Sequence, residues 1–171
     1  MVAATSQAPA RPATPASVAA TVAPPPTPAP AGAKLNILIV EDEGYTKTLL
    51  RAVAHAIGAH QVHAASGGKA ALKTADEASV NLVVCDLHLP DMSGLDLLRE
   101  MRRRIPDVPF LLISNMSDPV HIQQAVDSGV SAIVVRPFSR AQIEAKLRFL
   151  AHRIAPNLAF GTARTPPVIH S

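Results

Sequence analysis

Short apolar runs recur along the chain from residue 35 onward, and longer segments with apolar positions at helical spacing separate them. The runs predict five β-strands, at residues 35–40, 61–65, 81–86, 109–114 and 132–137. Most of these runs are continuous and do not alternate with polar residues, which is typical of strands that are buried on both faces of a parallel sheet.

The segments between the runs predict helices. Apolar stripes mark four of them: Leu49, Leu50, Val53 and Ile57; Leu97, Leu98, Met101 and Ile105; Ile122 and Val126; and Ile143, Leu147, Leu150 and Ile154. Small residues dominate residues 68–78, which predict a further helix with a weaker signal. Asp118 with Pro119, and Ser139, have the residue types expected at helix starts.

This alternation predicts an α/β fold. We expect a doubly wound, flavodoxin-like, five-stranded parallel sheet in the order 2-1-3-4-5, with helices on both faces. The domain is expected to span residues 34–154. Residues 1–33 hold half of the sixteen prolines and predict a disordered Pro/Ala-rich extension, and residues 155–171 predict a flexible tail.

Composition narrows the classes of function. The formal net charge is only +3 and aromatic residues make up 3%, so we expect no nucleic-acid partner. No apolar run approaches the ~20 residues of a membrane span, so no membrane association is expected. The single cysteine, Cys85, cannot form an internal disulfide, which fits a reducing cytoplasm.

Acidic residues follow two of the predicted strands. Glu41 and Asp42 follow the first strand, and Asp86 ends the third. A single acid after a strand is usually a solvated loop residue, but the carboxyl ends of these two strands flank the switch point of the predicted sheet, where ligands bind. Three converging carboxylates would repel one another, and a cation with oxygen ligands, such as Mg²⁺, relieves that repulsion.

Four segments, in this order and spacing, resemble the receiver domain of bacterial two-component response regulators: "ILIVEDE", "VVCDLHLPDMSGLDLL", "FLLIS" and "AIVVRPF". The most specific piece is the pattern D-x-x-x-P-x-M-S-G, which begins at Asp86 and ends at Gly94. The resemblance covers about residues 35–153.

The resemblance implies a role for each matching residue. Asp86 would accept a phosphoryl group from a phosphohistidine on a sensor histidine kinase or a histidine phosphotransfer protein. Glu41, Asp42 and Asp86 would hold Mg²⁺, with the backbone carbonyl of His88 as a further ligand. Ser114 would hydrogen-bond the phosphoryl group and help to drive a conformational switch.

Three positions depart from the family pattern. Arg136 stands where the family usually has a lysine; it can clamp phosphate oxygens as a functional substitute, which we favour, or pair with Asp86 and block the pocket. Ile133 stands where an aromatic switch residue is common, and we expect it merely to pack. Asn115 is bulkier than the small residue usual after Ser114.

Our leading interpretation is a stand-alone response regulator that is a phosphoacceptor rather than an enzyme, although it can dephosphorylate itself. The resemblance implies a downstream protein target at the face of the fourth helix, fifth strand and fifth helix, where receiver domains commonly dock, and the basic last helix suits an acidic partner there. The alternative is a pseudo-receiver adaptor that works without phosphorylation. A phosphatase is disfavoured, because His88 stands where such an enzyme wants a second acid.

Overall fold

The computed structural model describes residues 33–115 and 119–156. Five strands, β1 (Asn36–Val40), β2 (Gln61–Ala65), β3 (Leu82–Asp86), β4 (Phe110–Asn115) and β5 (Ala132–Arg136), alternate with five helices. The helices are α1 (Gly44–Ala56), α2 (Gly68–Glu77), α3 (Gly94–Arg104), α4 (Pro119–Asp127) and α5 (Arg140–Ile154). This is the alternation that the sequence predicts.

All five strands are parallel, in the order β2-β1-β3-β4-β5, so the predicted sheet is confirmed. Every residue of the central strands β1 and β3 is buried, as their uninterrupted apolar runs predict. β2 and β5 lie at the edges of the sheet and are partly exposed, which explains the weak apolar signal of "QVHAA" in β2.

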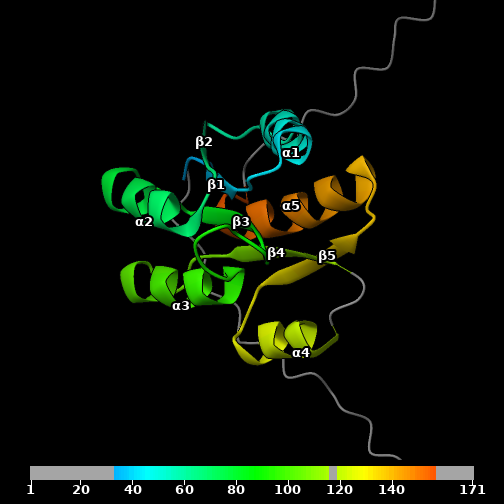
Figure 1. Ribbon diagram of the computed structural model, residues 1–171. Coiled ribbons are helices and arrows are strands. Elements are labelled where there is room, and N and C mark those ends of the chain that lie inside the picture. The colour runs from blue at the N-terminus through cyan, green and yellow to red at the C-terminus, as the bar shows by residue number, and fades with distance from the viewer. Residues whose placement is uncertain (1–32, 116–118, 157–171) are drawn as a thin grey trace, which may run out of the picture.

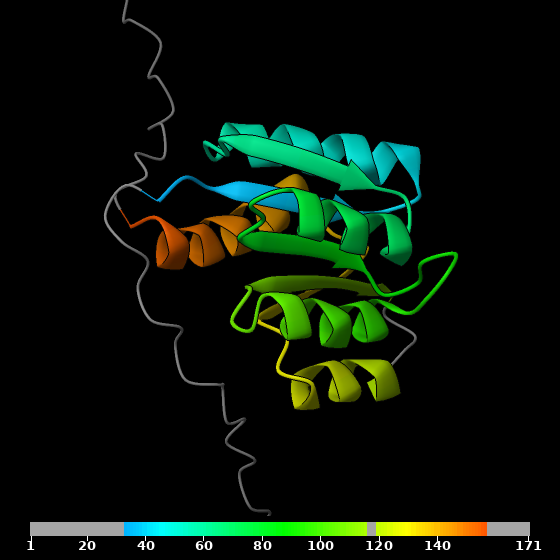
Figure 2. The same cartoon turned by 90° about the vertical axis from the view of Figure 1, so that its left-hand side faces the viewer.

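Helices cover both faces of the sheet (Figures 1 and 2). On one face, Leu50 and Val53 of α1 and Leu147 of α5 share a buried core with β1, β3 and β4. On the other face, residues of α2, α3 and α4 form a second core. Ile133 packs against this second core, so the expectation that it packs is confirmed.

The helix starts follow local chemistry. The Ser139 side chain accepts a hydrogen bond from the Gln142 backbone N–H, and the Gln142 side chain bonds back to Ser139, which completes a capping box at α5. Asp118, the expected cap of α4, lies outside the described residues, as do residues 1–32 and 157–171. No helix in the described part of the chain is both long and apolar enough to cross a membrane.

Candidate functional site

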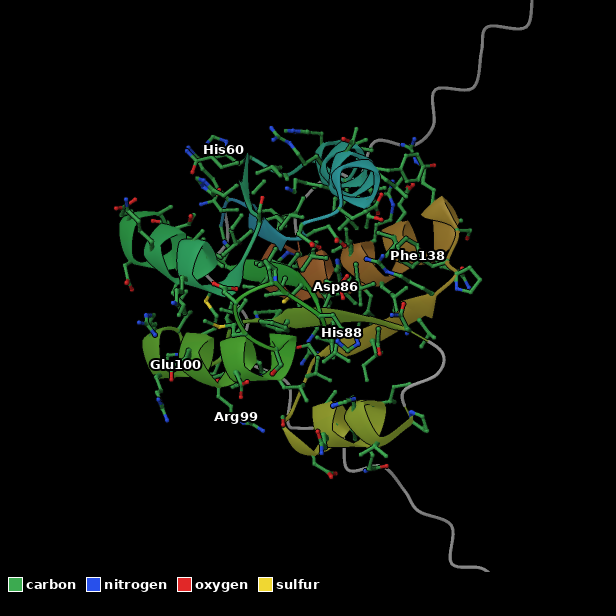
Figure 3. The ribbon with its side chains drawn as sticks, viewed as in Figure 1. His60, Asp86, His88, Arg99, Glu100 and Phe138 are labelled. Carbon is green, nitrogen blue, oxygen red and sulfur yellow. The ribbon has the colours of Figure 1, made fainter. Side chains whose placement is uncertain are left out.

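Parallel pairing brings the carboxyl ends of β1, β3, β4 and β5 to one edge of the sheet. Glu41 follows β1, Asp86 ends β3, Ser114 is the penultimate residue of β4, and Arg136 ends β5. Figure 3 labels Asp86 at this edge, with His88 on the side of α4 and Phe138 on the side of α5.

Arg136 joins two of the predicted acids. Its Nη2 lies 2.6 Å from Oε2 of Glu41 and 2.8 Å from Oδ2 of Asp86. The side chain of Glu41 is fully buried and that of Asp86 is 12% exposed, whereas that of Arg136 is 27% exposed. A single guanidinium nitrogen therefore serves two largely buried carboxylates on strands that are not adjacent to β5.

Backbone amides bind the other oxygens of these carboxylates. The Glu43 N–H donates to Oε1 of Glu41 at 3.1 Å, and the His88 N–H donates to Oδ1 of Asp86 at 3.0 Å. Each carboxylate oxygen of the pair thus accepts at least one hydrogen bond, which is what buried acids need in order to remain charged.

Burial raises the pKa of Glu41 above its ordinary value of 4.5, and the neighbouring charge of Asp86 raises it further. The hydrogen bond from the Glu43 backbone and the charge of Arg136 oppose this rise. The carboxylates of Glu41 and Asp86 therefore need a positive charge beside them, and in this structure the Arg136 guanidinium provides it.

Asp42 makes no ion pair with Arg136 among those that the structure shows, and it is exposed, whereas Glu41 is buried. The sequence predicts that three carboxylates converge. The structure joins Glu41 and Asp86 through Arg136, and the convergence of Asp42 with them stays a prediction. Among the described residues, no group of three or more His, Cys, Asp or Glu side chains lies in a metal-binding arrangement.

The donor atoms present are nonetheless of the kind that Mg²⁺ takes. Glu41, Asp42 and Asp86 supply only carboxylate oxygens, which are the hard ligands this ion prefers. The residues fit the ion chemically, with Arg136 as a competing cation on two of them. The assignment of Glu41, Asp42, Asp86 and the His88 carbonyl as ligands stays a prediction.

Ser114 and Cys85 are neighbours of Asp86 in the sheet: Cys85 precedes it in β3, and Ser114 follows Ile113, its partner in β4. Ser114 is buried, and its hydroxyl lies 3.4 Å from the Asn115 carbonyl oxygen, to which it donates a weak bond. Asn115 itself is exposed at the end of β4. Burial raises the pKa of the Cys85 thiol well above its usual range, so this thiol is protonated and is a poor nucleophile.

The loop after Asp86 has contacts that sequence analysis missed. Oδ1 of Asp91 accepts the Gly68 N–H at 2.7 Å, and Oδ2 accepts the Lys69 N–H at 2.9 Å. The carboxylate thus caps α2, whose own N-cap residue, Gly67, has no side chain to do so. The only signal of this cap in the sequence is the pair of glycines at the start of α2, which lack capping side chains, and it does not indicate that Asp91 is the residue that caps the helix.

A groove of about 550 Å³ adjoins the acidic site. Its lining comes from the start of α1 and from the segment between β5 and α5: Tyr45, Thr46, Leu49, Arg136, Pro137, Phe138 and Arg140. The Arg136 guanidinium carbon lies 5.9 Å from the centroid of the Phe138 ring, so Arg136 contacts both the groove and the acids.

Comparison with known proteins identifies the family. Residues 37–148 match the model of the response regulator receiver domain. The transcriptional regulatory protein KdpE of Mycobacterium tuberculosis (strain ATCC 25618 / H37Rv) is 34% identical over 117 residues, which are 68% of this chain and 51% of KdpE. The aerobic respiration control sensor protein ArcB of Escherichia coli (strain K12) is 33% identical over 67% of this chain and 15% of its own length.

Solved structures share the fold. The chemotaxis response regulator CheY4 of Vibrio cholerae superposes with a TM-score of 0.63 at 21% identity, over 68% of this chain and 98% of CheY4. The receiver domain of NtrX from Brucella abortus superposes with a TM-score of 0.63 at 24% identity, over 67% of this chain and 97% of the NtrX chain. The chain spans about half the length of curated relatives such as KdpE.

Proposed function

The chain belongs to the response regulator receiver domain family of two-component signalling, and on that premise we propose that Asp86 is its phosphoacceptor. The observation that carries this proposal is the placement of Asp86 at the end of a buried strand, beside a cation that also binds a buried acid. The phosphoryl donor would be a phosphohistidine of a sensor histidine kinase or a histidine phosphotransfer protein.

The proposed reaction is one displacement at phosphorus. A carboxylate oxygen of Asp86 attacks the phosphoryl group, the O–P bond forms, and the P–N bond to the donor imidazole breaks with its electron pair returning to nitrogen. The rigid strand β3 holds the short aspartate side chain in place. Little covalent assistance is required beyond positioning and neutralisation of charge.

We assign the remaining roles on the same premise. Arg136 and the Ser114 hydroxyl would bind the oxygens of the transferred phosphoryl group. Receiver domains generally use Mg²⁺, and here Glu41, Asp42, Asp86 and the backbone carbonyl of His88 would hold it. Bound at this site, the ion supplies positive charge to the phosphoryl oxygens.

We further propose that output is by protein–protein contact in the cytoplasm. Exposed apolar side chains on α4 and α5 support this: Val120 of α4 is 64% exposed, and Phe149 of α5 is 60% exposed. The Arg153 guanidinium lies 5.9 Å from the Phe149 ring, so the surface combines apolar and basic character, which suits an acidic, amphipathic partner.

One observation favours a second candidate, a pseudo-receiver adaptor that is never phosphorylated. The ion pair between Arg136 and Asp86 ties up an oxygen of the nucleophile at 2.8 Å. An adaptor would keep that pair permanently.

The test is the intact mass of the protein after incubation with Mg²⁺ and acetyl phosphate, beside Asp86→Ala and a control, Asp96→Ala, which removes an exposed acid of α3. If Asp86 is the phosphoacceptor, wild type and Asp96→Ala each gain the mass of one phosphoryl group, and Asp86→Ala does not. If no gain is seen with this donor, and none with phosphorylated histidine kinases, the adaptor is the correct function.

A further inference from the structure

Arg136 uses one nitrogen for two acids that the proposed function assigns to a divalent cation. Nη2 lies 2.6 Å from Glu41 Oε2 and 2.8 Å from Asp86 Oδ2, so the same N–H donors occupy an oxygen on each carboxylate. The opposite oxygens already accept the backbone N–H groups of Glu43 and His88. Neither carboxylate has an oxygen free of a hydrogen-bond donor.

A metal ion and this guanidinium compete for the same atoms. A divalent cation binds carboxylate oxygens through lone pairs, and an N–H donor aimed at the same oxygen uses that lone pair and adds like charge beside the ion. The backbone amides are fixed by the turn after each strand, whereas Arg136 is a long side chain with rotatable bonds. Arg136 is therefore the group that can leave.

The groove beside the acids gives Arg136 a place to go. Arg136 already lines this groove of about 550 Å³, together with Tyr45, Leu49 and Phe138. The guanidinium carbon lies 5.9 Å from the Phe138 ring centroid, so a rotation away from the acids keeps the cation against an aromatic face. Arg140 lines the same groove but makes no ion pair with either acid among those the structure shows.

We propose that Arg136 is an internal competitor of the metal: the guanidinium and a divalent cation bind Glu41 and Asp86 alternately, and metal binding displaces Arg136 into the groove. The site is thus neutralised when no metal is present, and metal affinity is lowered by the cost of breaking both ion pairs. This inference rests on the proposed function for the assignment of Glu41 and Asp86 as ligands of Mg²⁺.

The test is the affinity for Mg²⁺ alone, by isothermal titration calorimetry, of wild type and Arg136→Gln. Without the competing guanidinium, Arg136→Gln is expected to bind Mg²⁺ at least tenfold more tightly, which corresponds to about 1.4 kcal/mol. The matched control is Arg140→Gln, which removes the same charge from the same groove without touching the acids and should change the affinity less than about threefold. Equal affinities of wild type and Arg136→Gln, or an equal gain in Arg140→Gln, would overturn the proposal.

A second measurement uses wild type only, so it does not depend on the folding of a variant. The Arg136 Nε–Hε signal in a ¹H–¹⁵N NMR spectrum should shift on saturation with Mg²⁺, and the Arg140 signal should shift much less. An unchanged Arg136 signal at saturation contradicts displacement. Neither readout involves phosphoryl transfer, so a protein that is phosphorylated normally but fails both tests would refute this inference and leave the proposed function standing.

Discussion

Charged side chains lie close together at the end of β3, where they are largely buried and water screens their charges little. Glu41 is fully buried, and its only cation among the ion pairs that the structure shows is Arg136. Removing one partner of a buried ion pair leaves an uncompensated charge, which costs far more than the loss of an exposed pair. Arg136 therefore has a structural role as well as its proposed role in phosphoryl transfer.

We predict that Arg136→Met lowers the free energy of unfolding by about 3 kcal/mol at pH 7, measured by urea denaturation. The deficit should shrink as the pH falls, because the pKa of Glu41 is raised above 4.5 and a protonated Glu41 needs no cation. In linkage terms, the folded state binds the proton more tightly than the unfolded state, so protonation stabilises the fold as the pH falls through the folded pKa.

Two further variants test this account. Adding Glu41→Gln to Arg136→Met should recover part of the loss at pH 7, because it removes the unpaired buried charge. Arg103→Met breaks an ion pair in which the arginine is 74% exposed, and it should cost less than about 1 kcal/mol. A deficit of Arg136→Met that stays constant with pH would refute the role assigned to Glu41.

At the scale of elements, two sets of hydrogen bonds fix the loop between β3 and α3: one joins its two ends, and the other ties its middle to α2. The Gly94 N–H donates to the Leu87 carbonyl at 2.7 Å, and the Asp91 carboxylate binds the start of α2. A Cβ at Gly94 would lie 2.5 Å from the backbone oxygen of Asp86 and 3.0 Å from the Leu87 Cα. The backbone of the loop that follows Asp86 therefore closes on itself where only glycine fits.

We predict that Gly94→Ala costs about 1–3 kcal/mol of stability, because the clash is with backbone that cannot move without displacing Asp86. Gly44→Ala is the control at the start of α1, where a new Cβ meets nothing within 4 Å. It should be neutral or stabilising by up to ~1 kcal/mol, since alanine favours the helix. Chemical denaturation of both variants measures the difference, and equal effects would contradict the close approach at Gly94.

Asp91 gives a prediction with a defined pH dependence. Hydrogen bonds from the Lys69 and Gly68 backbones lower the pKa of Asp91 below its ordinary value of 3.8. A lowered folded pKa contributes stability that is present above 3.8 and is lost as the pH falls through the folded pKa. Asp91→Ala should therefore be less stable than wild type at pH 7, and the two melting temperatures should converge in strong acid. A difference that persists there would mean that the capping role is not electrostatic.

The elements were predictable from sequence because burial fixes their pattern. The runs of β1, β3 and β4 lie in the middle of the sheet and are apolar on both faces, so their bounds could be found to within about a residue. The Asp91 cap joins residues 23 apart in the chain, and no local pattern encodes it.

At the scale of the whole molecule, two cores on opposite faces hold the sheet, and the site lies at the edge that both cores leave open. The family and the fold follow from the match over residues 37–148 and from the strand order. The substitution of arginine for the usual lysine had two interpretations in the sequence. The structure shows the ion pair with Asp86, and which of the two interpretations describes its function depends on whether Asp86 is phosphorylated.

The measurement that tests the central claim most directly is the location of the phosphoryl group. Treatment of the phosphorylated protein with borohydride reduces an aspartyl phosphate to homoserine and releases phosphate, and peptide mass mapping then finds the changed residue. The account predicts homoserine at position 86 and unchanged acids at positions 41 and 42. Reduction at another carboxylate, or at none after treatment with Mg²⁺ and every phosphodonor tried, would contradict it.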